Sequence, residues 1–92
     1  MNKIFNVGLI GCGHIAETYF RAHKYFNNFK IIKCADINHK AAIKCAKINK
    51  IKAVSIKEIL NDKEIKVILN LTIPAAHYSV ANQAIRHGKH VY

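Results

Sequence analysis

The chain has few features that would divide it or anchor it in a membrane. Its four Gly and single Pro form no linker, and no repeat or low-complexity stretch interrupts it. The 92 residues therefore predict one small domain, residues 1–92. No window approaches the roughly 18 consecutive apolar residues of a spanning helix, so we expect no membrane association.

Cysteine is scarce as well, with residues at positions 12, 34 and 45 only. An odd number at irregular spacing argues against a disulfide framework. The first apolar run, residues 4–10, is interrupted by Asn6 and ends in a glycine turn without a small-residue cleavage site. Because this run does not resemble a signal peptide, the sequence favours a reducing, cytoplasmic location.

Acidic residues are also few: five Asp and Glu against fifteen Lys and Arg, a net charge of +10. Such a balance can reflect a polyanion partner whose counterions are released on binding. Here the Lys residues are scattered from Lys3 to Lys89, and Arg, which dominates specific phosphate and base readout, occurs only as Arg21 and Arg86. The pattern favours a solvated basic surface, with nucleic-acid binding as the weaker alternative.

What the chain does have is a hydrophobic pattern that alternates in type along its length. Short apolar and β-branched runs predict strands at residues 4–10, 29–36, 53–54, 65–72 and 89–92. Helical spacing predicts helices at residues 14–26, 40–49, 55–60 and 74–87. In the second helix, the residues expected to face the sheet are Ala42, Ile43, Ala46 and Ile48. Ser55 and Glu58 match a capping box, and Gly88 suits a left-handed cap after the last helix.

This alternation of strands and helices fixes the expected fold class. Right-handed crossovers between such strands give a parallel sheet covered on both faces. We predict an α/β fold, a Rossmann-type doubly wound parallel sheet with five strands in the order 3-2-1-4-5. The last strand begins at Lys89 and the chain ends inside it, so the sheet is expected to be incomplete there. Exposed apolar surface and a free edge then predict poor solubility or self-association.

The segment after the first strand, Gly-Cys-Gly-His-Ile-Ala at residues 11–16, matches a dinucleotide-binding turn. The first glycine permits the tight turn, the second lets the backbone approach a pyrophosphate, and Ala16 allows close helix–strand packing. The helix N-terminus adds N–H groups and partial positive charge. The predicted phosphate-binding residues are Gly11, Cys12, Gly13, His14 and Ile15. The alternative is a turn that only joins strand to helix.

Asp36 lies twenty residues beyond Ala16, at the predicted end of the second strand. An acid at this place can bind both ribose hydroxyls of an adenosine. It also repels a 2′-phosphate, which favours NAD as the cofactor, whereas the nearby Lys40 keeps NADP as an alternative. The other interpretation of Asp36 is a solvent-exposed residue that ends a strand.

The end of the fourth strand is the third candidate segment. Ligands of open α/β sheets bind where the strand order reverses, which here lies between the first and fourth strands. Residues 11–15 and 72–77 would then flank one crevice. The predicted cofactor-binding residues of this segment are Thr72, Ile73, Pro74 and His77. His77 would donate to a ligand or orient another group, and a capping or surface histidine is the alternative.

Other chemistry finds little support in the sequence. Cys12 lies at a helix N-terminus, a place that lowers a thiol pKa, but no neighbouring base points to nucleophilic catalysis. The Cys12-x-His14 and His87-x-x-His90 pairs lack the four ligands of a structural metal site, so no metal is predicted.

Together these segments resemble the N-terminal half of the glucose-fructose oxidoreductase / inositol dehydrogenase (Gfo/Idh/MocA) family, over the whole chain. Residues 7–16 are similar to the family's opening strand and glycine turn, and residues 34–36 to its strand end with the ribose-binding acid. The most specific likeness is in residues 70–77 and 88–92. The family has Thr-Pro at the strand end and a His five residues after the Thr. Here Thr72 and His77 keep that interval, and Pro74 is displaced by one position.

The resemblance implies an NAD(P)-dependent oxidoreductase that transfers hydride on a sugar- or polyol-type hydroxyl or carbonyl. In the family, a Glu-Lys-Pro motif with a catalytic Lys follows the Gly-Lys-His-Val segment, and a second α/β domain binds the small-molecule substrate and mediates oligomerisation. This chain stops at Tyr92, before that motif. We therefore expect a cofactor-binding fragment without a catalytic residue, with weak NAD binding, no turnover, and a homo-oligomer only when the missing domain is present. The alternatives are a non-catalytic nucleotide-binding module or a truncated gene product.

Overall fold

The computed structural model describes residues 4–23 and 28–92. Strands and helices alternate along these residues, in the order β1 (Phe5–Ile10), α1 (His14–His23), β2 (Phe29–Ala35), α2 (His39–Asn49), β3 (Lys52–Ala53), α3 (Ile56–Asn61), β4 (Ile65–Asn70), α4 (Pro74–Arg86) and β5 (His90–Val91). The strands form one parallel sheet in the order β3-β2-β1-β4-β5. The predicted α/β, Rossmann-type doubly wound sheet and its strand order are confirmed.

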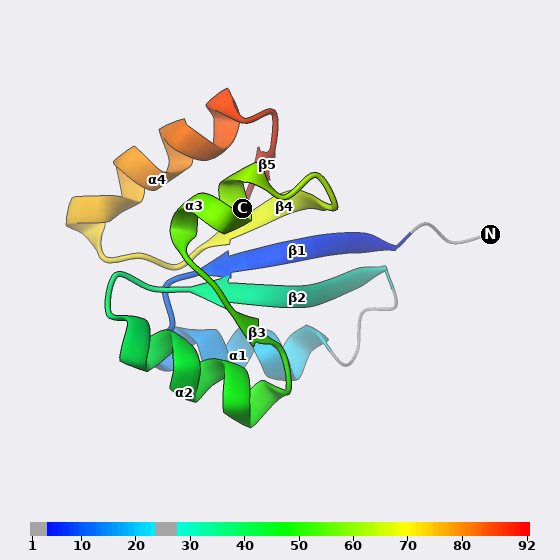
Figure 1. The fold of residues 1–92 in the computed structure, drawn as a ribbon, viewed down its shortest axis with the longest axis vertical. Coiled ribbons are helices and arrows are strands. Elements are labelled where there is room, and N and C mark those ends of the chain that lie inside the picture. Colours follow the sequence, from blue (N-terminus) through cyan, green and yellow to red (C-terminus); the bar gives the residue numbers. More distant parts are fainter. Residues whose placement is uncertain (1–3, 24–27) are drawn as a thin grey trace.

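The helices cover the sheet from both sides, with α1 and α2 on one face and α3 and α4 on the other (Figure 1). Each face has its own apolar core. The first is built on Val7, Leu9, Ala16, Phe20, Ile31, Cys34, Ala42, Ala46 and Leu69. The second is built on Ile10, Ala35, Val54, Ile59, Leu60, Ile65, Ile68, Val80 and Ala84. Because β1 supplies buried residues to both cores, its end is held firmly between the two layers.

The helix ends follow the chemistry of their flanking residues. The Ser55 hydroxyl accepts a hydrogen bond from the Glu58 N–H at 3.1 Å, as the capping box predicts. Pro74 opens α4, and Gly88 follows that helix with a φ of 74°, as predicted for a left-handed cap. The cap of α2 was not predicted: Asn38 Oδ1 accepts from the Lys40 N–H at 3.1 Å.

Several predicted boundaries were wrong by one or two residues. The third strand lies at Lys52–Ala53, one residue earlier than predicted, and β4 ends at Asn70 rather than residue 72. β4 stops there because the Asn70 side chain bonds the following backbone. The last predicted residues of the first helix, 24–26, lie outside the described residues.

The orientation of α2 is a further correction. Ala42 and Ala46 face the sheet as predicted, but Ile43 and Ile48 are 51% and 61% exposed. At 3.6 residues per turn, a face centred on positions 42 and 46 turns positions 43 and 48 towards solvent. The isoleucines suggested a wider apolar stripe than the helix buries.

Among the described residues, the helices are all too short or too polar to cross a membrane.

Candidate functional site

The turn between β1 and α1 begins with a glycine that no other residue can replace without strain. Gly11 has a φ of 103°, in the region that favours glycine. A Cβ at this position would lie 2.6 Å from the carbonyl carbon and oxygen of Leu71. The Gly11 N–H also donates to the Ala35 carbonyl oxygen at 2.9 Å. The turn therefore packs directly against the last residue of β2 and the residue that follows β4.

Gly13 occupies a different environment. It is exposed, and no heavy atom of the described residues lies within 4 Å of a Cβ built on it. Ala16, one turn further, is buried in the first core, which matches its predicted packing role. The N–H groups of the first helical turn lack intrahelical partners and carry the positive end of the helix dipole. The open space beside Gly13 thus borders a place suited to an anion.

Asp36 is in direct contact with the glycine turn. Its Oδ2 accepts a hydrogen bond from the Cys12 N–H at 2.7 Å, and its Oδ1 accepts one from the Asn38 N–H at 2.8 Å. The side chain is only half-buried. A carboxylate offers about four acceptor positions, so both oxygens can still accept hydroxyl groups. The residues predicted for phosphate and ribose binding are therefore adjacent, as the motif requires.

Asn70 organises the segment after β4. It is 3% exposed, and its Nδ2 donates to the His77 carbonyl oxygen at 2.9 Å. Its Oδ1 accepts from the Thr72 hydroxyl at 2.6 Å and from the Thr72 N–H at 3.3 Å. The Leu71 N–H donates to the Ile10 carbonyl oxygen at 2.8 Å, which holds this segment against the glycine turn. Sequence reasoning missed this role, although a polar residue at the end of a strongly apolar strand was a usable signal.

The remaining predicted residues lie around this edge of the sheet. Ile15 is exposed in the first turn of α1, and His14 begins that helix. Thr72 is half-buried, whereas Ile73, Pro74 and His77 are exposed where α4 starts. The structure thus brings the three predicted segments together at the carboxyl ends of β1, β2 and β4. Their contacts with a cofactor stay a prediction.

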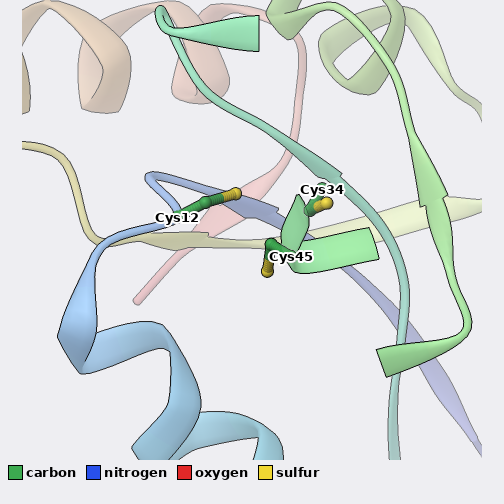
Figure 2. Close-up of side chains that lie close together, drawn as sticks. All are labelled: Cys12, Cys34 and Cys45. Carbon is green, nitrogen blue, oxygen red and sulfur yellow. The ribbon is translucent and has the colours of Figure 1, made fainter. Parts of the chain in front are cut away.

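Sequence reasoning also missed a group of three thiols behind the glycine turn. The Sγ atoms of Cys12, Cys34 and Cys45 all lie within 4.8 Å of one another, and Figure 2 shows the Cys12 side chain extending towards the other two. Hydrogen bonding to Cys34 and burial raise the pKa of the Cys12 thiol. The lowering expected at a helix N-terminus was wrong, because the side chain turns into the core.

Residues 5–92 match the model of the Gfo/Idh/MocA family, described as an oxidoreductase family with an NAD-binding Rossmann fold. The chain belongs to this family. The resemblance predicted from the three segments is confirmed. No curated protein matches the chain.

Solved structures of enzymes share the fold of this Gfo/Idh/MocA chain. Myo-inositol dehydrogenase from Lactobacillus casei, in complex with NAD(H) and myo-inositol, superposes with a TM-score of 0.85 at 21% identity, over 96% of this chain and 27% of that one. A 3-ketoreductase from Actinomadura kijaniata with NADP gives 0.87 at 21% identity, over 97% and 28%. Biliverdin reductase from Synechocystis sp. PCC 6803, with biliverdin and NADP+, gives 0.84 at 25% identity, over 94% and 28%. The chain therefore spans about a quarter of the length of these proteins.

Proposed function

We propose that this chain is the cofactor-binding part of an NAD(P)-dependent oxidoreductase. The reaction is hydride transfer between a nicotinamide and a carbon that bears a hydroxyl or carbonyl, in a small sugar- or polyol-type substrate. The observation that carries the proposal is the 2.7 Å hydrogen bond from the Cys12 N–H to Asp36, which holds the carboxylate that we propose as the ribose acceptor against the glycine turn. The family description, an NAD-binding Rossmann fold, supports the same assignment.

The open turn and its donor set fit a dinucleotide. We assign pyrophosphate contacts to the backbone N–H groups of Gly13, His14 and Ile15, because the Cys12 N–H already donates to Asp36. Gly11 and Cys12 give the turn its shape. Asp36 accepts the 2′- and 3′-hydroxyls of the adenosine ribose. The dinucleotide supplies the hydride chemistry when bound, and this chain binds and orients it.

The segment that starts α4 completes the proposed site. We assign Thr72, Ile73, Pro74 and His77 to the nicotinamide side, since strand order reverses between β1 and β4. Asn70 positions this segment through its bonds to Thr72 and His77 and does not itself contact the cofactor.

NADH binding by calorimetry tests the proposal. Asp36→Ala removes the ribose acceptor, and Gly13→Val puts a side chain into the open space beside the turn, where an added Cβ meets no heavy atom within 4 Å. We expect each variant to weaken NADH binding by tenfold or more, about 1.4 kcal/mol. Glu64→Ala, which removes a carboxylate far along the chain, is the control and should bind as the wild type does. Unchanged binding in both Asp36→Ala and Gly13→Val would overturn the proposal.

Asp36 also sets the proposed preference for NAD over NADP, because its carboxylate repels a 2′-phosphate. We expect the wild type to bind NADH more tightly than NADPH. Asp36→Ser should weaken NADH binding and should narrow or reverse the difference between the NADH and NADPH affinities. The carboxylate then no longer repels the 2′-phosphate, and the basic Lys40 follows four residues along the chain. Equal NADH and NADPH affinities in the wild type would contradict the assignment.

The proposal includes catalysis, but we assign no catalytic residue among the 92 residues of this chain. The Glu-Lys-Pro motif and the domain that binds substrate and mediates oligomerisation would follow Tyr92. Sequencing the codons downstream separates the alternatives: Glu-Lys-Pro supports the enzyme, and a stop codon supports a non-catalytic nucleotide-binding module. The three free thiols support a reducing compartment such as the cytoplasm.

A further inference from the structure

Three cysteines that are distant in the sequence form one cluster behind the glycine turn. Cys12 comes from the turn, Cys34 from β2 and Cys45 from α2 (Figure 2). Cys34 is buried in the first core, and the half-buried Cys12 and Cys45 pack against that core. All three are free thiols. Each element contributes one sulfur, so the fold itself assembles the group.

The spacing of the sulfurs suits a shared metal ion. Metal–thiolate bonds are about 2.3 Å long, so three sulfurs around one ion in a plane stand about 4 Å apart. The three Sγ atoms already lie within 4.8 Å of one another. Side-chain adjustments of less than about 1 Å would therefore bring them into contact with a common ion.

The donor set also indicates which class of ion would bind. Thiolates are soft ligands that select Cu(I), zinc or iron–sulfur clusters, whereas carboxylates suit harder ions. Structural zinc sites are almost always four-coordinate. Among the residues that the structure describes, no His, Asp or Glu joins the three cysteines. A three-sulfur set without a fourth ligand favours a soft monovalent ion.

We propose that Cys12, Cys34 and Cys45 bind one Cu(I) ion. Binding converts three thiols to thiolates, forms three Cu–S bonds and releases three protons to solvent, with no change in oxidation state. The hydrogen bonds from the Cys12 and Cys34 thiols to the carbonyls of Ala35 and Ala42 are lost in exchange. The half-exposed Cys12 provides the entry path.

Two properties of the chain bear on the strength of the site. The three-thiolate complex carries two negative charges, and the chain that binds it has a net charge of +10. Because binding displaces three thiol protons, the affinity for Cu(I) should increase with pH.

The test is an anaerobic titration of the reduced 92-residue chain with Cu(I), in competition with a coloured Cu(I) chelator. We expect one ion per chain. Cys12→Ser, Cys34→Ala and Cys45→Ser should each lower the affinity for Cu(I) by more than about 100-fold, because each removes one of the three ligands. Removing a group that only orients a ligand costs less, about 10–100-fold. Ile48→Ser introduces the same side chain on the exposed face of α2 and should leave the affinity unchanged.

X-ray absorption spectroscopy on the copper-loaded wild type counts the sulfur ligands of copper, so it tests the proposal even where a variant fails to fold. Three sulfur neighbours around one copper are expected. Two sulfur neighbours, a stoichiometry other than one, or wild-type affinity in any single cysteine variant would overturn the proposal. Displacement of the bound Cu(I) by equimolar Zn(II) would overturn the choice of ion.

Discussion

Gly11 and Gly13 stand two positions apart and are required for different reasons. Gly11 combines a φ of 103° with backbone atoms of Leu71 at 2.6 Å from an added Cβ, so its requirement comes from the fold. Gly13 has open space around it, so its requirement comes from the ligand we propose. The motif alone does not separate these two roles, because both positions are simply glycine in the sequence.

Alanine substitution should separate them experimentally. Gly11→Ala should lower the free energy of unfolding by about 2–4 kcal/mol, from an unfavourable φ and a backbone overlap. Gly13→Ala should change it by less than about 1 kcal/mol, since the methyl group meets no neighbour. Urea denaturation of the two variants measures the difference. Equal losses would mean that the turn is not held against Leu71 as described.

Asn70 gives a second prediction at the residue scale. Asn70→Ala leaves the Thr72 hydroxyl and N–H without their acceptor in a half-buried place, so the free energy of unfolding should fall by about 1–3 kcal/mol. The Thr72 amide should also exchange its hydrogen faster. Asn61→Ala, at an exposed position on α3, is the control. A loss no larger than that of the control would contradict the structural role of Asn70.

At the scale of elements, the period of apolar residues together with the capping residues predicted every strand and helix that the structure describes, because burial on one or both faces imposes that period. The end of β4 and the orientation of α2 could not be predicted from this period. The first depends on the hydrogen bonds of Asn70, and the second depends on which face of the helix packs against the sheet. The cysteine cluster was invisible for the same reason. Its members lie 22 and 11 residues apart, and only the order of β2, α2 and the turn brings them together.

An ion pair between β2 and the end of α3 predicts how stability depends on pH. Lys33 Nζ lies 2.6 Å from Asp62 Oδ2, and this hydrogen bond lowers the pKa of Asp62 below its ordinary value of 3.8. Because the folded pKa is the lower one, the contribution is present above pH 3.8 and is lost as pH falls through the folded pKa. Asp62→Asn should flatten this acidic decline, as followed by urea denaturation at several pH values.

The same pair acts at the alkaline end with the opposite sign. The hydrogen bond to Asp62 raises the pKa of Lys33 above 10.5, so its contribution is full below pH 10.5 and is lost as pH rises through the folded pKa.

For the acidic experiment with Asp62→Asn, Glu64→Gln is the matched control. If it flattened the acidic decline as much as Asp62→Asn does, the Lys33–Asp62 pair would not be its cause.

At the scale of the whole molecule, the described residues leave one face of the sheet partly uncovered. A cavity of about 330 Å³ opens on the side of α1, and it is lined by Val7, Tyr19, Ala22, Phe29, Ile31, Val67, Leu69 and Tyr92. The lining is apolar, and contiguous apolar surface of this kind promotes association. The relatives whose fold this chain shares are about four times as long. The expected self-association of the 92-residue chain therefore has a specific location.

Two exposed tyrosines make this last prediction testable. Tyr92 borders the cavity and is 80% exposed, whereas Tyr78 on α4 is 78% exposed and lies outside the cavity lining. We expect the wild-type sedimentation coefficient to rise with protein concentration, because apolar cavity surfaces from two copies cover each other. Tyr92→Glu places a charge at the rim and should suppress that rise, while Tyr78→Glu adds the same charge elsewhere and should not. Equal suppression by both would assign the effect to net charge, and a concentration-independent monomer in the wild type would show that the open face does not drive association.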